Sequence, residues 1–166
     1  MEENEFVIEQ YEIGTRYEGF KRGGKRNGLG KFFYSEGSCY DGEWKDNKMN
    51  GYGILTYPNG AKAYEGYWKD DEFEGTGTIY NDSQATLDSP FDYTDFSQLD
   101  DYWVSYEGEI HEGKKHGIGK LILTNGESYS GRFVNDEVEG EGIYTRSNGG
   151  KVKGLWSESR LRRTFS

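Results

Sequence analysis

Cysteine and proline are scarce in this sequence, with one Cys and two Pro among 166 residues. A single cysteine, Cys39, excludes a disulfide framework within the chain and a zinc site built from several cysteines. No apolar run approaches the roughly 18–20 residues that a membrane-spanning helix needs. The N-terminal residues, MEENEF, are acidic and polar, unlike a signal or transit peptide. We therefore expect a protein of a reducing compartment, most simply the cytoplasm.

Apolar residues are also few, but aromatic residues and glycine are not. Hydrophobic residues make up 33% of the chain and the formal net charge is −10, a combination that is often found in disordered proteins. Disordered chains are poor in aromatic residues, however, and this one has 14 Tyr, 9 Phe, 4 Trp and 25 Gly. This composition favours a β-structure in which aromatic rings cover glycine backbone.

Recognisable catalytic patterns are missing. The only histidines, His111 and His116, are five residues apart and make a weak metal site. No Ser, His and Asp stand in a triad context, and no glycine-rich phosphate loop is present. The acidic net charge argues against nucleic-acid binding. The sequence therefore predicts a protein that is not an enzyme, with no catalytic, cofactor-binding or metal-binding residues.

A repeat of 23 or 24 residues runs through most of the chain. Each unit begins with Tyr and has Gly two, eleven and thirteen residues later. Units begin at Tyr17, Tyr40, Tyr64, Tyr106 and Tyr129, and a broken sixth unit begins at Val152. The positions predicted to define the repeat include Tyr40, Gly42, Trp44, Gly51, Gly53, Tyr64, Gly66, Trp68, Gly75, Gly77, Tyr106, Gly108, Gly117, Gly119, Tyr129, Gly131, Phe133, Gly140 and Gly142. We interpret these residues as structural.

The offsets inside one unit indicate two β-strands. Positions 0, 2 and 4 alternate, as do positions 11, 13, 15 and 17, so each set shares one face of a strand. A short polar turn separates the two sets, and a second turn such as Asn59-Gly60 joins each hairpin to the next. We expect the first Tyr and the ring at position 4 to lie across the glycines at positions 11 and 13.

The predicted fold is all-β: an elongated, single, twisted antiparallel sheet of stacked hairpins. Ser157, followed by Glu158, is also compatible with the start of a short C-terminal helix.

The segment Tyr40-Asp-Gly-Glu-Trp44, followed by a turn and Gly51-x-Gly53, resembles the MORN repeat. The resemblance covers residues 11 to 156, apart from one insertion. It implies a non-catalytic scaffold or adaptor for protein–protein interaction, because such repeats occur in radial-spoke head and other axonemal proteins, in junctophilins and in regulatory segments of some enzymes. A short chain made almost only of repeats looks most like a structural component of a ciliary axoneme or cytoskeletal complex. The implied location is the cytoplasm, at the axoneme or cytoskeleton, and the implied partners are axonemal or cytoskeletal proteins.

We expect one repeat array over residues 1–166, with an acidic insertion at 82–104 and a basic tail at 157–166. No Lys or Arg occurs between Asp70 and Gly113, a stretch with thirteen Asp and Glu. The insertion also carries spaced aromatic residues, which are Phe91, Tyr93, Phe96, Tyr102 and Trp103. Two interpretations remain open: the insertion docks a partner, or it packs on the sheet as a lid with its rings inward.

Basic residues gather around the turn of the first repeat and in the tail, at Arg160, Arg162 and Arg163. These three are candidate contacts for an acidic protein surface or an anionic lipid. A membrane-tethering module that binds anionic phospholipid is therefore the alternative function, although the net charge of −10 disfavours it. Open sheet edges would also permit self-association.

Overall fold

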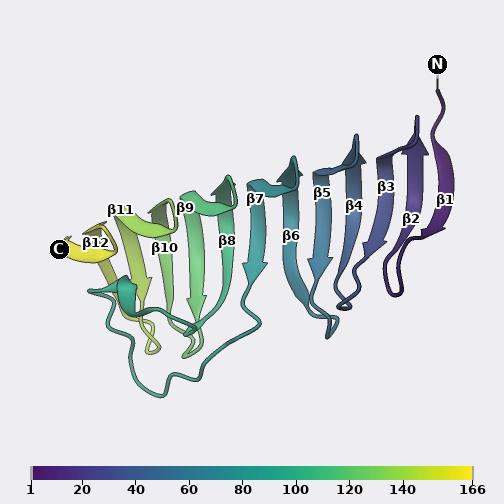
Figure 1. The fold of residues 1–166 in the computed structure, drawn as a ribbon. Coiled ribbons are helices and arrows are strands. Elements are labelled where there is room, and N and C mark those ends of the chain that lie inside the picture. The colour runs from purple at the N-terminus through teal and green to yellow at the C-terminus, as the bar shows by residue number, and fades with distance from the viewer. Residues whose placement is uncertain (1, 166) are drawn as a thin grey trace. The chain divides into compact units, whose positions relative to one another are not determined.

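The structure is a computed structural model in which residues 2–165 are described, and its regular structure is almost entirely β-strand (Figure 1). The strands are β1 (Glu5–Gln10), β2 (Arg16–Arg22), β3 (Lys25–Phe33), β4 (Cys39–Lys45), β5 (Lys48–Thr56), β6 (Lys62–Lys69), β7 (Glu72–Tyr80), β8 (Trp103–His111), β9 (Lys114–Leu123), β10 (Ser128–Val134), β11 (Glu137–Thr145), β12 (Lys151–Ser157) and β13 (Arg160–Thr164). One 3-10 turn, η1 (Phe96–Gln98), lies in the insertion. The strands follow chain order in one 13-stranded antiparallel sheet, which confirms the predicted fold class.

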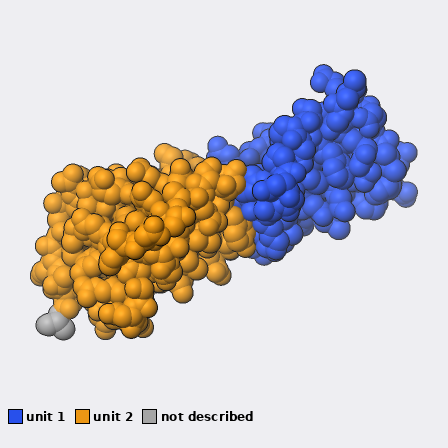
Figure 2. All heavy atoms as spheres, turned by 90° about the horizontal axis from the view of Figure 1, so that it is seen from below, with its two compact units in different colours: residues 1–77 blue, residues 78–166 orange. Residues whose placement is uncertain are grey.

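Two compact units divide the chain, residues 1–77 (unit 1) and residues 78–166 (unit 2), and Figure 2 colours them separately. Unit 1 is built from β1 to β6 and most of β7. Unit 2 holds the insertion and β8 to β13. The same hairpin repeats in both units, so each unit can be described with the same positions.

Each repeat begins with a tyrosine that lies over two facing glycines. Gly42 and Gly53 are Cα partners in β4 and β5. A Cβ added to Gly53 would lie only 2.5 Å from two ring carbons of Tyr40, and Tyr40 itself is 0% exposed. The ring therefore covers the glycines at positions 2 and 13. The expectation for position 11 was wrong, because Gly51 has a φ of +99° and its missing side chain faces Glu43 instead.

The hydroxyl of the same tyrosine binds a carbonyl that a β-bulge sets free. The register of β4 and β5 shifts between Gly42 and Trp44, which leaves Glu43 without a partner in β5. The Tyr40 hydroxyl donates to the Glu43 carbonyl oxygen at 2.7 Å. The equivalent bonds, at 2.6–3.1 Å, run from Tyr17 to Phe20, Tyr64 to Tyr67, Tyr106 to Glu109 and Tyr129 to Arg132. Each tyrosine thus replaces a hydrogen bond that the bulge removes from the ladder.

Tryptophan at position 4 links one hairpin to the hairpin before it. Trp44 Nε1 donates to the Gly30 carbonyl oxygen at 3.1 Å, and Trp68 Nε1 donates to that of Gly53 at 3.1 Å. The Trp44 ring also meets the Tyr40 ring edge to face, with centroids 5.0 Å apart. Consecutive hairpins in unit 1 are therefore joined by side chains as well as by strand pairing.

Two kinds of turn alternate along the sheet. Inside a repeat, two residues with positive φ close the hairpin, for example Asp46 (48°) and Asn47 (71°), which is the signature of a type I′ turn. Between repeats, three-residue loops close on a glycine in the left-handed region, as at Gly60, whose N–H donates to the Tyr57 carbonyl oxygen at 2.9 Å. The Asn-Gly pairs thus belong to the longer loops. Acidic or amide residues occur in most of the two-residue turns, whereas Gly23 and Gly24 form the turn between β2 and β3.

The predicted C-terminal helix is wrong. Glu158 (φ 51°) and Ser159 (φ 65°) form another two-residue turn, which leads into β13. Leu161 then pairs with Trp156 across the hairpin. The local cap signal of Ser157 is overridden because strand pairing covers Trp156, which is 1% exposed.

The first prediction concerns the tyrosine hydroxyl. Replacing Tyr40 with Phe keeps the ring over Gly53 but leaves the Glu43 carbonyl without a donor, so we expect a loss of about 1–2 kcal/mol in the free energy of unfolding. Tyr67, which is 51% exposed, provides the control. Tyr67→Phe should change stability by less than about 0.5 kcal/mol. Urea denaturation measures both, and equal effects of the two variants would contradict this role of Tyr40.

The second prediction concerns alkaline pH. Burial raises the pKa of Tyr17 to about 12, and burial is also the largest cause of the raised pKa of Tyr40, Tyr64, Tyr106, Tyr129 and Tyr144. These tyrosines ionise near about 10 in the unfolded chain, which therefore binds fewer protons than the folded chain above that pH. As far as these tyrosines contribute, the free energy of unfolding should be level between about pH 6 and pH 9. It should then fall by up to about 1.4 kcal/mol per pH unit for each such tyrosine. Urea titrations across this range test it, and a flat profile to about pH 11 would contradict it.

Candidate interaction surfaces

The two faces of the sheet differ in character. We call the face that carries the repeat tyrosines the tyrosine face, and the opposite one the outer face. On the tyrosine face the rings pack on one another and are buried. The outer face exposes large apolar side chains, namely Phe6, Ile8, Phe20, Leu29, Tyr52 and Tyr67 in unit 1 and Ile118 and Ile122 in unit 2. Clusters of exposed apolar side chains of this kind mark sites of interaction.

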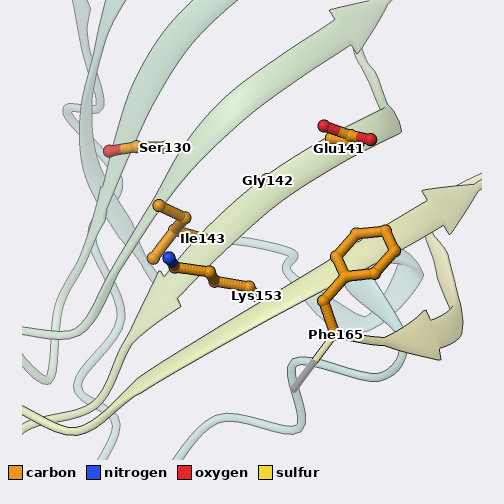
Figure 3. Close-up of a pocket in the computed structure, with 6 residues that line it drawn as sticks. All are labelled: Ser130, Glu141, Gly142, Ile143, Lys153 and Phe165. Carbon is orange, nitrogen blue, oxygen red and sulfur yellow. The ribbon is translucent and has the colours of Figure 1, made fainter.

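Shallow pockets lie on the outer face of both units. In unit 1, Phe6, Phe20 and Leu29 line a pocket of about 280 Å³, with Lys31 and Asp41 also at its wall. In unit 2, a pocket of about 300 Å³ is lined by Ser130, Glu141, Gly142, Ile143, Lys153 and Phe165 (Figure 3). Both pockets combine an apolar ring with charged neighbours. Both can therefore receive an apolar side chain that is flanked by polar groups.

The insertion lies against the tyrosine face of unit 2. Phe96 is 5% exposed, and its ring centroid lies 5.3 Å from that of Tyr129 and 6.1 Å from that of Trp156. Phe91 packs on Phe96 at 5.3 Å, and Tyr93 stacks on Tyr144 at 4.9 Å. The rings therefore point inward, as in the lid interpretation. Figure 1 shows this teal segment crossing unit 2 before the chain returns to β8.

A buried carboxylate fastens the insertion to the repeats. Glu127 is 1% exposed and accepts hydrogen bonds from the N–H of Phe91 (2.9 Å) and of Ser147 (3.2 Å). It also accepts from the Tyr144 hydroxyl and from the Asn125 amide, both at 2.8 Å. Burial raises the pKa of Glu127, but these four donors outweigh burial and lower it below the usual value. Glu127 therefore stays ionised at neutral pH.

The insertion also pairs with the edge of β13. The Phe96 N–H donates to the Ser159 carbonyl oxygen at 2.8 Å, and the Leu161 N–H donates to that of Thr94 at 2.8 Å. These bonds place Asp95 opposite Arg160 in an isolated antiparallel bridge. The insertion thus supplies a short extra strand beside the last strand of the sheet.

The structure places the predicted contact residues in three environments. Phe91 and Phe96 are buried against the tyrosine face, so they hold the segment in place. Tyr93, Tyr102 and Trp103 are half-buried. Arg160, Arg162 and Arg163 are exposed on β13. Partner binding by any of these residues stays a prediction, and for the two buried rings it would require the insertion to lift.

Two kinds of residue on the tyrosine face were not predicted from the sequence. The first is the residue nine positions after the tyrosine that begins a repeat. In the first repeat this residue is Arg26, whose guanidinium carbon lies 5.8, 5.3 and 4.6 Å from the ring centroids of Tyr17, Phe32 and Trp44. The second is Glu127. At its place in the repeat the other regular units have Ser38, Ala61 and Gly150, and this contrast was a usable signal.

The two histidines lie on the two strands of one hairpin, β8 and β9. The His111 and His116 rings lie 5.7 Å apart, but His116 Nδ1 accepts from the Asn135 N–H at 3.3 Å, as a turn residue would. Over residues 2–165 there is no group of three or more His, Cys, Asp or Glu that could hold a metal ion. No helix in that same range is long and apolar enough to cross a membrane.

Comparison with known proteins agrees with the repeat. The MORN repeat family model matches residues 17–39, 40–62, 64–84, 106–128 and 129–151, which together make up more than half of the chain. Each match begins at one of the five repeat tyrosines. A Plasmodium falciparum (isolate 3D7) protein named inactive protein tyrosine kinase pTKL is 33% identical over 57 residues. That alignment covers 34% of this chain and 4% of the Plasmodium protein.

The third prediction tests the anchor of the insertion. Glu127→Ala leaves the Tyr144 hydroxyl and two backbone N–H groups without their acceptor, so we expect a loss of about 2–3 kcal/mol in stability and faster amide exchange at Phe91. Glu141→Ala, at an exposed position in the same unit, is the control and should have little effect. Because the pKa of Glu127 is lowered on folding, its contribution is complete above about pH 4.5. It is lost as the pH falls through the folded-state pKa. Unchanged Phe91 exchange in Glu127→Ala would contradict the anchoring role.

Proposed function

The chain belongs to the MORN-repeat family, and we propose that it is a non-catalytic scaffold that binds other proteins through the outer face of its sheet. MORN repeats are generally modules for protein or lipid interaction, and the proteins that carry them are typically not catalytic. The observation that carries the proposal is the run of exposed apolar side chains on the outer face, such as Leu29 (62% exposed) and Tyr67 (51%). Such a surface is costly in water unless a partner covers it.

We further propose that the complex is ciliary or cytoskeletal. This finer assignment rests on the likeness of a short chain made of repeats to axonemal MORN proteins. The tyrosine face of unit 1 supports a passive role, because its tyrosines and tryptophans are engaged with glycine backbone and with each other. What remains available for binding is the outer face, the insertion and the basic strand β13.

Affinity capture tests the scaffold proposal. A tagged chain is recovered from a lysate of its own cells beside the double variant Leu29→Glu/Tyr67→Glu, and partners are quantified by mass spectrometry. We expect axonemal or cytoskeletal partners, with at least fivefold lower recovery on the double variant. Ile13→Glu is the matched control, because Ile13 is 98% exposed but lies in the turn after β1. Equal recovery on all three proteins would overturn the outer face as the docking surface.

The alternative function is membrane tethering through anionic phospholipid. One observation favours it: Arg22, Lys25, Lys45 and Lys48 are exposed at the tips of two neighbouring hairpins. Each cation near an anionic surface contributes about 1 kcal/mol, but carboxylates are repelled similarly, and the chain carries an excess of them. Flotation with phosphatidylcholine vesicles containing phosphatidylserine discriminates. We expect no binding, whereas binding that Arg22→Glu/Lys25→Glu abolishes would favour the tether.

A further inference from the structure

We propose that the edge of β13 and three rings beside it form a docking site for an acidic, extended segment of a partner protein, and that residues 92–96 occupy this site in cis. The rings are those of Tyr129, Tyr144 and Trp156, which we call the ring seat. The inference rests on the proposed function, since both concern protein partners, but it uses the tyrosine face of unit 2 rather than the outer face.

The ring seat has room for an incoming side chain because one of its own residues is short. In the first repeat, the long Arg26 side chain covers the equivalent rings of Tyr17, Phe32 and Trp44. The residue at the same position of the fifth repeat is Val138, which cannot reach so far. Phe96 takes that place instead, with its centroid 6.1 Å from that of Tyr144 and within 6.1 Å of the other two. The seat is thus completed by a residue from outside the repeat.

The backbone beside the ring seat is the edge of β13, the strand at the end of the sheet. An unpaired edge is a template for an added strand, in which main-chain hydrogen bonds provide affinity and a pocket for a side chain provides specificity. Thr94 and Phe96 bind the backbone of Leu161 and Ser159 in this way. The Phe96 ring enters the seat at the same time. The segment therefore makes both kinds of contact that a strand-adding ligand would make.

The exposed arginines of β13 indicate that the segment bound there should be acidic. β13 exposes Arg160, Arg162 and Arg163, whereas residues 82–104 contain no Lys or Arg. Asp95 lies directly opposite Arg160. A competing segment should accordingly be acidic and extended, with a Phe or another large ring at the place of Phe96.

The contacts that hold the cis segment are ones that a partner segment of the same chemistry can reproduce. Two backbone hydrogen bonds join it to Ser159 and Leu161. Trp156 Nε1 and Arg146 donate to the carbonyl oxygen and the hydroxyl of Tyr93 at 2.8 and 2.6 Å, and the Phe96 ring is buried. The flanking residues 88–90 and 97–98 are exposed. Exchange requires only local opening of residues 92–96, which costs less free energy than global unfolding, and a partner segment restores the lost contacts. A partner segment present at high local concentration can therefore replace residues 92–96 while the rest of the repeat array stays folded.

Peptide binding tests the inference with the full chain. The probe is a fluorescein-labelled peptide with the sequence of residues 90–99, and binding is followed by fluorescence anisotropy. Wild-type protein should bind it weakly, and Phe96→Ala, which removes the ring from the seat, should bind it at least ten times more tightly. Ile13→Ala, at an exposed position in the turn after β1, is the control and should bind as the wild type does. A Phe96→Ala protein that folds but binds no better than wild type would overturn the proposal.

Further experiments test the role of charge and the alternative that a second copy of the chain occupies the site. In the Phe96→Ala background, Arg160→Glu/Arg162→Glu should weaken binding at least tenfold. A peptide with Lys in place of both Asp92 and Asp95 should fail to bind. Equal binding of the acidic and basic peptides would overturn the chemistry assigned to the occupant. Light scattering that shows a Phe96→Ala dimer with no affinity for the peptide would assign the site to a second copy and overturn the proposal likewise.

A last measurement needs no variant. A saturating excess of unlabelled peptide added to wild-type protein should speed amide exchange at Phe96, because the cis segment is displaced, while Leu161 stays protected by the peptide. Unchanged exchange at Phe96 would overturn displacement even if Phe96→Ala fails to fold. These assays leave the outer face untouched, so failure here is distinguishable from failure of the scaffold proposal, which the lysate experiment detects.

Discussion

The contact on which the rest of this structure depends is that between a tyrosine and two facing glycines, closed by a hydrogen bond from the hydroxyl to a bulged carbonyl. Gly42 and Gly53 leave room for the Tyr40 ring, and the ring shields backbone that glycine would otherwise expose. The bulge at Glu43 disrupts the ladder, and the Tyr40 hydroxyl accounts for the freed carbonyl. Ring, glycines and bulge depend on one another, so the period of the repeat follows from a single packing unit.

Adjacent repeats are coupled by a second, smaller set of contacts at the turns. The Asp71 side chain accepts from the Met49 N–H at 2.9 Å, and the Asp71 N–H donates back to the Met49 carbonyl at 3.0 Å. Asp136 makes the same reciprocal pair with Lys115. Both acidic residues hold a positive φ near 70°, which Asp tolerates better than most residues. Stability in such an array comes mainly from neighbouring repeats, as in other solenoid proteins.

In unit 2 the insertion supplies a ring and a backbone segment that the repeats themselves lack. Val138 is too short to cover its rings, and the last strand has an edge that needs a partner. Phe96 and the backbone of residues 94–96 meet both needs at once. Glu127 then fixes the start of the segment through the N–H of Phe91. The carboxylates of the insertion are exposed, apart from Asp95, which is half-buried opposite Arg160, so burying the rings does not require burying the carboxylates.

The sequence by itself determined the all-β fold, the hairpin unit and the starts of the repeats, because these depend on residues within about twenty positions of one another. The tertiary structure alone decided the rest. Ser157 and Glu158 suit a helix start, yet pairing of Leu161 with Trp156 makes them a hairpin turn. Where the rings of the insertion point depends on Val138 and Glu127, which lie more than thirty residues from Phe91 and Phe96. No local pattern contains that information, because the size of the seat and the position of the buried carboxylate exist only once the strands have come together.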